Sequence, residues 1–408
     1  MLDLDRAIVE FESLDRRLLK TISERPIWDL SKESDRSEVR RIFVESQGFD
    51  KIPMPEISYE CVSEEIKFGC RVQKLTGTSW ENCALASHLF LPLSQEKCPV
   101  VLCACGHGDT KLGYAKMAIT LAQRGIACLV PDNMGQLERA PMGHWLETAP
   151  FDCGFSFMAM LTTEQLANLN WLKKDDRFTN IGIAGNSGGG TLSMCLAAIA
   201  PEWVDAISSS GYPSSFEWIC RKRKRHCACN LFPGVLGKIE HEDLYSLFAP
   251  RPLRLMMGVF DNLIPLDVFR ATEGRVGMTY KKMNCSENFT TAVWHGPHPW
   301  NKEAAGLNAD FFAEIFKLDT PKREPDDEVF ELEDFSAIGN VYDKYPDWAV
   351  STAELAYRFA GKTVPDKIPE LEDIWKCECN ETYPELYPSG TAERIMAQWR
   401  CFIDGFQK

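Results

Sequence analysis

The sequence predicts an α/β fold with a mostly parallel central sheet that is flanked by helices. Between about residues 100 and 300, consecutive apolar runs such as Val100–Cys105 and Ile126–Val130 alternate with segments of helical periodicity. The runs are apolar at adjacent positions, as in strands that are buried on both faces of a parallel sheet. One of them, residues 181–184, leads directly into a glycine-rich turn that contains a serine.

The first part of the chain is expected to differ from this pattern. Residues 1–56 are charged and predict an N-terminal helical extension, because their apolar residues recur at helical spacing, as do Ile8, Phe11, Leu14 and Leu18. From residue 57 to residue 91, apolar and polar residues alternate, which predicts an antiparallel meander of half-buried strands. The meander is expected to open a catalytic domain that spans residues 57–317.

The remaining elements follow from the apolar runs and the segments between them. Strands are expected at residues 100–105, 126–130, 181–184, 204–208, 253–257 and 290–294, and helices at 114–124, 163–174 and 188–200. Residues 213–242 interrupt the alternation and are expected to form an insertion, for which a cap over the site is one option. Residues 318–408 are too rich in aromatic residues for a disordered tail, so we expect a C-terminal extension packed on the core.

Composition narrows the class of partner. The 408 residues carry a formal net charge of -14, which argues against nucleic acid, because phosphate binding needs a surplus of Lys and Arg. No run approaches the length of a membrane span, so no membrane partner is expected. The chain has 16 cysteines but starts without the pattern of a signal peptide, which favours a reducing cytoplasmic location. The oligomeric state stays open, and a homo-oligomer is one option.

A candidate nucleophile is the serine of the sequence Gly185-Asn186-Ser187-Gly188-Gly189. This is a G-x-S-x-G pattern between an apolar strand and a helix of small residues, the context in which such a turn exposes a nucleophilic serine. The glycines at 185 and 189 are expected because a Cβ would clash where the backbones approach closely. Ser187 is therefore predicted to be the nucleophile.

A serine hydroxyl needs a base to take its proton and an acid to orient that base. Asp261 stands in a turn after the strand at 253–257, with Asp267 as the alternative acid. Two histidines follow the last strand, and His298 is preferred because it lies in the loop beyond a glycine, with His295 as the alternative. Serine, acid and histidine follow one another in the chain in the order that is typical of triads whose serine stands in such a turn between a strand and a helix.

An oxyanion hole requires backbone N–H donors in fixed positions. The N–H of Gly188, directly after the nucleophile, is the first candidate. The second is expected in the turn after the strand at 100–105, from the backbone of Asp109 or, alternatively, of Gly108. The substrate-binding candidates are His107, a residue of that turn, and Trp300 near His298. The pair of Trp294 and Trp300 is more typical of core packing, and a platform for a sugar is the alternative.

The cysteines near residue 227 are candidate metal ligands. Cys220, Cys227 and Cys229 stand close to His226, but the spacing of Cys227 and Cys229 is tighter than the paired spacing of most structural zinc sites. The expectation from the sequence is therefore buried thiols and no metal.

At these residues the chain resembles the acetyl xylan esterase-like, dienelactone hydrolase-related branch of the α/β-hydrolase superfamily. The resemblance covers roughly residues 60–317 and rests on the triad candidates and on the segments Pro131–Arg139, His226–Gly234, Ala249–Leu253 and Gly296–Trp300. It implies an α/β-hydrolase fold and an esterase, often a deacetylase of acylated sugars, without a metal or organic cofactor. It also supports His298 as the catalytic histidine.

The resemblance leaves other functions open. The same triad serves thioesterases, lactonases and peptidases, and the fold also occurs in proteins that bind a partner without catalysis. The substrate expected from the sequence is a small-molecule or saccharide ester.

Overall fold

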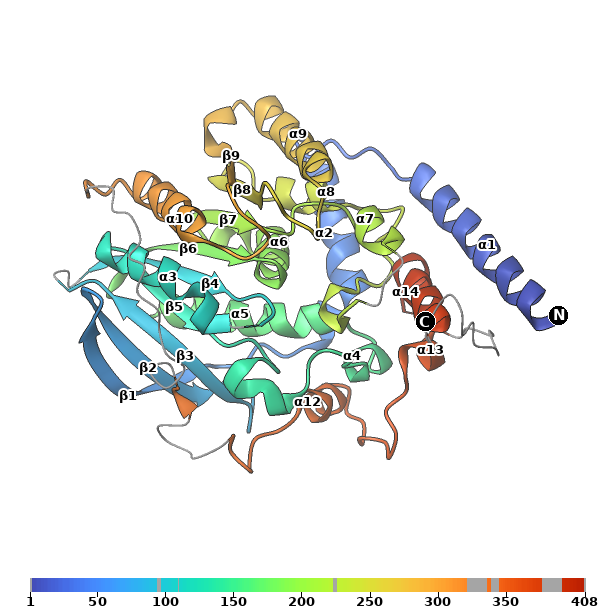
Figure 1. Ribbon diagram of the computed structural model, residues 1–408, viewed down its shortest axis with the longest axis horizontal. Coiled ribbons are helices and arrows are strands. Elements are labelled where there is room, and N and C mark those ends of the chain that lie inside the picture. The colour runs from blue at the N-terminus through green and yellow to red at the C-terminus, as the bar shows by residue number, and fades with distance from the viewer. Residues whose placement is uncertain are drawn as a thin grey trace.

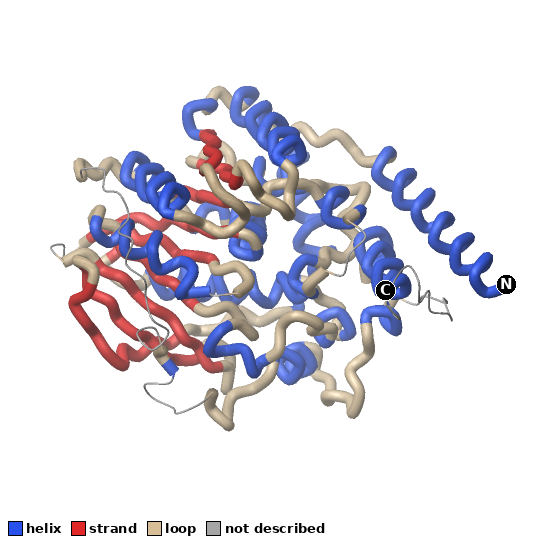
Figure 2. The backbone as a smooth tube through the Cα atoms, viewed as in Figure 1, coloured by secondary structure: helices blue, strands red, loops and turns tan. Residues whose placement is uncertain are grey.

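The structure is a computed structural model that describes residues 2–93, 97–108, 110–222, 226–320, 336–338, 345–375 and 391–406. Its centre is a nine-stranded sheet with the strand order β1-β2-β3-β5-β4-β6-β7-β8-β9. Helices lie on both sides of this sheet (Figures 1 and 2). The predicted fold class, a mostly parallel sheet flanked by helices, is confirmed.

One edge of the sheet is the antiparallel meander that the alternation of residues 57–91 predicts. It consists of β1 (Ser58–Lys67), β2 (Cys70–Thr78) and β3 (Ala84–Leu91), and β3 then pairs antiparallel with β5 (Ala127–Pro131). Residues of the outermost strand, β1, are half-buried or exposed, whereas every residue of β3 is buried.

The parallel part of the sheet follows from β5 to the opposite edge. Its other strands are β4 (Cys98–Ala104), β6 (Phe178–Asn186), β7 (Ala206–Ser210), β8 (Leu253–Gly258) and β9 (Phe289–Trp294). The side chains of β4 alternate between two cores: Val101 and Cys103 pack into one, and Val100 and Leu102 into the other. Both faces are covered, which explains why the strand is apolar at every position.

Two layers of helices cover these faces. One contains α3 (Thr110–Gln123) and α10 (Lys302–Ile315), which contact each other, and the other contains α2 (Glu33–Gln47), α5 (Phe157–Lys173) and α6 (Gly188–Ile199). The helix α9 (Leu266–Lys282) lies beside β8 and β9. The short helices are α4 (Ala149–Asp152), α7 (Phe216–Arg221), α8 (His241–Ser246), and the 3-10 turns η1 (Phe49–Lys51), η2 (Leu137–Met142), η3 (Pro201–Trp203), η4 (Ala228–Asn230) and η5 (Ser286–Asn288).

The helix predicted from residue 163 begins earlier, at Phe157. Its N-terminus is capped by Ser156, whose side chain accepts a hydrogen bond from Ala159 N at 3.0 Å. The first residues of this helix are buried on all sides, so they lack the periodicity of an amphipathic helix. The sequence pattern therefore signals only the second part of the helix.

The terminal segments also fold. Near the N-terminus, α1 (Leu2–Ser23) precedes α2, and near the C-terminus the helices are α12 (Thr352–Phe359), α13 (Leu371–Ile374) and α14 (Thr391–Asp404). The helix α14 lies against the insertion at residues 213–242: Trp399 Nε1 donates to Cys220 O at 2.9 Å, and Gly234 N donates to Cys401 O at 2.8 Å. In the described part of the chain, no helix has the length and hydropathy that a bilayer crossing requires.

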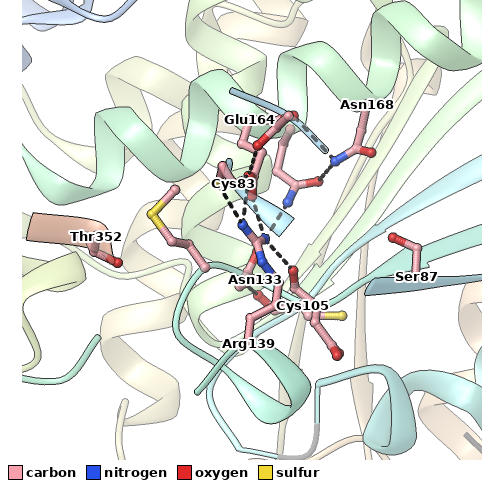
Figure 3. Close-up of polar contacts among 12 residues, drawn as sticks. Cys83, Ser87, Cys105, Asn133, Arg139, Glu164, Asn168 and Thr352 are labelled. Carbon is pink, nitrogen blue, oxygen red and sulfur yellow. Dashed lines mark hydrogen bonds and ion pairs between the residues drawn. The ribbon is translucent and has the colours of Figure 1, made fainter. Parts of the chain in front are cut away.

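A buried polar network joins the segment after β5 to α5 (Figure 3). Arg139 makes two hydrogen bonds to Glu164, at 2.7 and 2.9 Å, and a third to the carbonyl oxygen of Asp132 at 2.9 Å. Glu164 also accepts a hydrogen bond from Ser79 Oγ at 2.8 Å. Both charged side chains are fully or almost fully buried, at 0% and 1% exposure. The pair fixes the residues that follow β5, beside the end of β4.

The network predicts a large loss of stability when one partner is removed. We expect Glu164→Gln and Arg139→Met each to lower the free energy of unfolding by about 3–5 kcal/mol, because each leaves a buried charge without its partner. Urea denaturation measures the change. The control is Lys174→Ala, which removes an exposed ion pair with Glu56 at 3.1 Å and should cost less than about 1 kcal/mol. If Glu164→Gln were as stable as the wild type, the buried ion pair between Arg139 and Glu164 would not contribute to stability as proposed.

Candidate active site

The turn between β6 and α6 has the backbone strain of a nucleophile elbow. Ser187 lies at φ 58° and ψ -122°, a conformation that non-glycine residues rarely adopt. Its N–H donates to Ser210 O at 3.0 Å, and its carbonyl oxygen accepts from Thr191 N at 3.0 Å. Strain of this kind persists only where the surroundings hold it. The serine is therefore fixed between the end of β7 and the first turn of α6.

Two glycines let the helix start this close to the strands. A Cβ added to Gly189 would lie 1.8 Å from the carbonyl oxygen of Ala104 in β4. A Cβ on Gly185 would lie 2.2 Å from the carbonyl oxygen of Gly189. Both contacts are with backbone atoms, which cannot move aside as a flexible side chain can. The predicted steric reason for these glycines agrees with the packing.

The structure brings two of the sequence-predicted site residues into direct contact. His298 Nδ1 and Asp261 Oδ2 are 2.7 Å apart, and the Asp261 side chain is only 1% exposed. The other carboxylate oxygen of Asp261 accepts from Leu263 N at 2.8 Å and from Ile264 N at 3.0 Å. The carboxylate is therefore held by its own turn while it orients the imidazole. His298 Nε2 is buried and has no hydrogen-bond partner among the described residues, so it is available to accept a proton.

The two alternative residues lie in other surroundings. His295 is exposed, and its ring packs against Phe260. Its backbone N–H donates to Glu303 Oε2 at 2.7 Å. Asp267 is exposed in the first turn of α9, where it accepts from Val268 N at 3.0 Å. Within the described part of the chain, these contacts join neither residue to the other or to Ser187.

A hydrogen-bonded set that the sequence reasoning missed holds the His298 loop beside the serine. Asn186 Nδ2 donates to His298 O at 3.1 Å, and Asn186 Oδ1 accepts from Ser210 Oγ at 3.0 Å. Trp300 Nε1 donates to the same Ser210 Oγ at 2.7 Å. Asn186 is the variable second position of the G-x-S-x-G pattern, so its identity gave no signal in the sequence.

The turn after β4 lies against the start of α6. A Cβ on Gly188 would be 3.4 Å from Gly106 Cα and 3.6 Å from His107 Nδ1. The hydroxyl of Tyr114 joins the two segments, since it accepts from Gly106 N and donates to Asn186 O, each at 2.9 Å. Burial raises the pKa of Tyr114, so its hydroxyl keeps the proton that it donates. Tyr114 was not singled out in the sequence.

Of the three predicted oxyanion donors, the structure describes Gly188 and Gly108. Gly188 is the first residue of α6, where backbone N–H groups have no partner within the helix. Gly108 N donates to Gln136 Oε1 at 3.3 Å, so its N–H already has an acceptor. Asp109, the preferred second donor, lies outside the described residues.

The two predicted substrate-binding side chains make contacts within the protein. Trp300 is half-buried, and besides its bond to Ser210 it packs edge-on against Tyr114, with ring centroids 5.0 Å apart. His107 packs against His144 and Trp145, with ring centroids 5.1 and 5.6 Å apart. Trp145 is 55% exposed and thus presents an aromatic surface near this turn.

His107 also belongs to a group of sulfur and nitrogen donors. Its Nε2 lies 3.2 Å from Cys229 Sγ, which lies 3.3 Å from Cys227 Sγ. With His144 they form a set whose ligand atoms all lie within 4.8 Å of one another. The hydrogen bond from Cys229 lowers the pKa of the Cys227 thiol, whereas burial raises that of Cys229. Along the sequence, the neighbours of these cysteines are Cys220 and His226. His107 and His144 are distant in the chain, so no local pattern indicated them as partners of the cysteines.

A cavity of about 1010 Å³ lies elsewhere, between the segment that joins α1 to α2 and the helices α7, α8 and α9. Arg25, Trp28, Trp218 and Arg275 are among its lining residues, and Ser187 and His298 are not.

The elbow packing predicts a sharp contrast between two glycine substitutions. Gly189→Ala should lower the free energy of unfolding by about 3 kcal/mol or more, because the new methyl group would overlap a backbone carbonyl. The matched control is Gly274→Ala in the exposed part of α9, where an added Cβ meets nothing within 4 Å. This control should stabilise the protein by up to about 1 kcal/mol through helix propensity. Denaturant titration of both variants compares them, and a Gly189→Ala variant as stable as the wild type would refute the packing.

Comparison with known proteins gives structural but no sequence relatives. No protein-family model matches the chain, and no curated protein matches it. A methylesterase is similar in structure, with a TM-score of 0.63 and 19% identity, over 79% of this chain and 73% of that one. A Bacteroides fragilis protein, whose description proposes an acetyl xylan esterase, has a TM-score of 0.52 and 16% identity, over 70% and 87%.

A third structural neighbour is a carbohydrate esterase family 15 glucuronoyl esterase from Caldicellulosiruptor kristjansonii. Its TM-score is 0.51 with 13% identity, over 77% of this chain and 92% of that one. These neighbours share the sheet and the helices that cover it. The chain therefore has the α/β-hydrolase fold that its sequence motifs predicted.

Proposed function

We propose that the protein is a serine esterase that hydrolyses small acyl esters, with Ser187 as nucleophile, His298 as base and Asp261 as the orienting acid. The observation that carries this proposal is the 2.7 Å contact between His298 and Asp261, together with the buried Nε2 of His298, which has no hydrogen-bond partner within the described part of the chain. A buried carboxylate stabilises the imidazolium that forms when the histidine takes a proton.

In the first step, Ser187 Oγ attacks the ester carbonyl carbon while its proton passes to His298 Nε2. The carbonyl π electrons move to the oxygen, which becomes the oxyanion of a tetrahedral intermediate. When this intermediate collapses, the bond to the alcohol oxygen breaks, and the alcohol leaves with the proton from His298. An acyl-enzyme on Ser187 remains.

The negative charge on the intermediate needs fixed donors. We assign one to the N–H of Gly188 and the other to the backbone of Asp109. The hydrogen bond from Gly108 N to Gln136 favours Asp109 over Gly108, because the Gly108 N–H is already engaged. Tyr114 supports this arrangement, since it ties the turn to the residue before the nucleophile.

In the second step, water replaces the alcohol. His298 takes a proton from the water, whose oxygen attacks the acyl carbon. The carboxylic acid then leaves as Ser187 recovers its proton from His298. These steps consume one water molecule and need no cofactor.

The proposed substrate class is an ester of a carbohydrate. The structural neighbours are described as a methylesterase, a proposed acetyl xylan esterase and a glucuronoyl esterase. The resemblance of residues 60–317 to the acetyl xylan esterase-like branch favours cleavage of an acetyl group over cleavage of a sugar acid ester. Trp145 and Trp300 offer aromatic faces for a sugar near the turn and near His298.

The first test of the nucleophile is hydrolysis of p-nitrophenyl acetate, butyrate and octanoate. The wild type should hydrolyse acetate best, and Ser187→Ala should lower kcat by a factor of about 10³ or more, because it removes the attacking atom. Circular dichroism establishes that the variant is folded. A folded wild-type protein without turnover on any of the three esters would refute the esterase proposal.

The two histidines give a matched test of the base. His298→Ala should lower kcat about as strongly as Ser187→Ala, because the residues of a triad act as a unit. His295→Ala removes an exposed ring only three residues away and should leave kcat within about twofold of the wild type. If His295→Ala instead caused the large loss, the assignment of His298 would be wrong.

A substrate panel tests the carbohydrate proposal. Acetylated xylo-oligosaccharides should be deacetylated with a higher kcat/KM than the methyl ester of glucuronic acid, with release of acetate and of methanol measured in parallel. Preference for the methyl ester would keep the serine mechanism and replace the substrate class. Activity on p-nitrophenyl acetate without activity on any carbohydrate ester would overturn the carbohydrate assignment alone.

A further inference from the structure

Four potential metal ligands from three separate segments meet beside the candidate active site. His107 comes from the turn after β4, His144 from the loop after η2, and Cys227 and Cys229 from the insertion at residues 213–242. His144, Cys227 and Cys229 are buried, and His107 is half-buried. Each residue offers one ligand atom, and these atoms lie within 4.8 Å of one another.

The spacing of the ligand atoms fits a small tetrahedral ion. In a zinc site with two sulfur and two nitrogen ligands, neighbouring ligand atoms are about 3.3–3.8 Å apart. Here the two sulfur atoms are 3.3 Å apart, and His107 Nε2 is 3.2 Å from Cys229 Sγ. Both distances lie within a few tenths of an ångström of these values, and all four ligand atoms lie within 4.8 Å of one another, so modest side-chain shifts would let them surround the ion.

The second histidine is oriented as a ligand. His144 Nδ1 lies 2.8 Å from the carbonyl oxygen of Met134, so it carries the proton that this acceptor requires. The other ring nitrogen, Nε2, is buried without a hydrogen-bond partner among the described residues. A carbonyl oxygen on one nitrogen and a metal on the other is the usual arrangement of a metal-bound histidine.

The segment that carries the cysteines is also held in place by its backbone. Ala228, between the two cysteines, donates its N–H to the carbonyl oxygen of Trp145 at 3.2 Å, next to His144. On the other side, His226 N donates to Gln398 Oε1 of the C-terminal helix α14 at 2.8 Å. The cysteine segment is therefore held by contacts that do not depend on an ion.

Charge and chemistry favour zinc. Two thiolates and two neutral imidazoles neutralise a divalent ion, so a buried site of this composition carries no net charge. Thiolate and imidazole ligands together in tetrahedral geometry are typical of Zn²⁺. The one departure is the spacing Cys227-Ala-Cys229, which is shorter than in most zinc sites, and the two sulfur atoms nevertheless lie 3.3 Å apart.

We propose that His107, His144, Cys227 and Cys229 bind one structural Zn²⁺ ion. Four protein ligands close the coordination sphere, as in structural rather than catalytic zinc sites. The ion would join the turn after β4 to the insertion and to the loop after η2. Because His107 lies beside Gly188, the ion would also hold the turn that faces the nucleophile. This inference is independent of ester hydrolysis.

The direct test is the metal content of the wild-type protein. The protein is produced in zinc-supplemented medium and purified with a reductant but without chelators. Inductively coupled plasma mass spectrometry should then find about one zinc ion per chain. Apoprotein loaded with Co²⁺ should show the visible bands of tetrahedral cobalt and a near-ultraviolet thiolate-to-cobalt band. Neither measurement depends on the folding of a variant.

Matched variants assign the ligands. The double variant Cys227→Ser/Cys229→Ser should lose the zinc. In competition with a chelator, His144→Gln should lower the zinc occupancy of the site at least tenfold. Cys61→Ser, which removes an exposed cysteine outside the cluster, should keep the wild-type content.

Four outcomes would overturn the proposal. Three of them are a wild-type protein without zinc even after zinc is added, full zinc content in the double cysteine variant, and a native disulfide between Cys227 and Cys229 detected by peptide mass mapping. The fourth is loss of zinc from Cys61→Ser as well, because the metal would then not depend on this cluster.

Discussion

The close packing of α6 on β4 and β6 is the constraint on which the rest of the site depends. Gly189 lies so near the Ala104 carbonyl that a methyl group has no room. This contact forces the chain to turn at once after the strand, and Ser187 absorbs the turn at φ 58°. Every other proposed catalytic group is placed relative to that serine. The strain is tolerated because the sheet and helix on either side of the turn are deeply buried.

Polar contacts between distant segments then align the remaining groups. Asn186 and Ser210 tie the histidine loop to the elbow, and Tyr114 ties the turn after β4 to the same place. Farther from the serine, the Arg139–Glu164 pair fixes the segment after β5. In a buried environment such contacts are specific, because a misplaced partner would leave a polar atom unsatisfied. The arrangement of the site is thus set by hydrogen bonds that cross the fold.

The C-terminal helix gives the insertion a support that an α/β sheet does not supply. Trp399 and the backbone of Cys401 bond to the insertion, and Gln398 bonds to the residue next to Cys227. Residues that are far apart in the chain therefore support the cysteine turn and, through His107, the turn beside Gly188. The proposed zinc ion would join this insertion to the turn after β4 and to the loop after η2.

The sequence by itself determined the strand and helix alternation, the elbow and the candidate triad, because these features are local. Apolar runs, glycines at fixed offsets and the order of Ser187, Asp261 and His298 can all be read along the chain. Only the tertiary structure decided which histidine contacts the acid, that Asn186 and Tyr114 hold the site, and that His107 and His144 approach the two cysteines. These are contacts between residues far apart in the chain, and their partners depend on how the sheet and the insertion fold together, which no local pattern records.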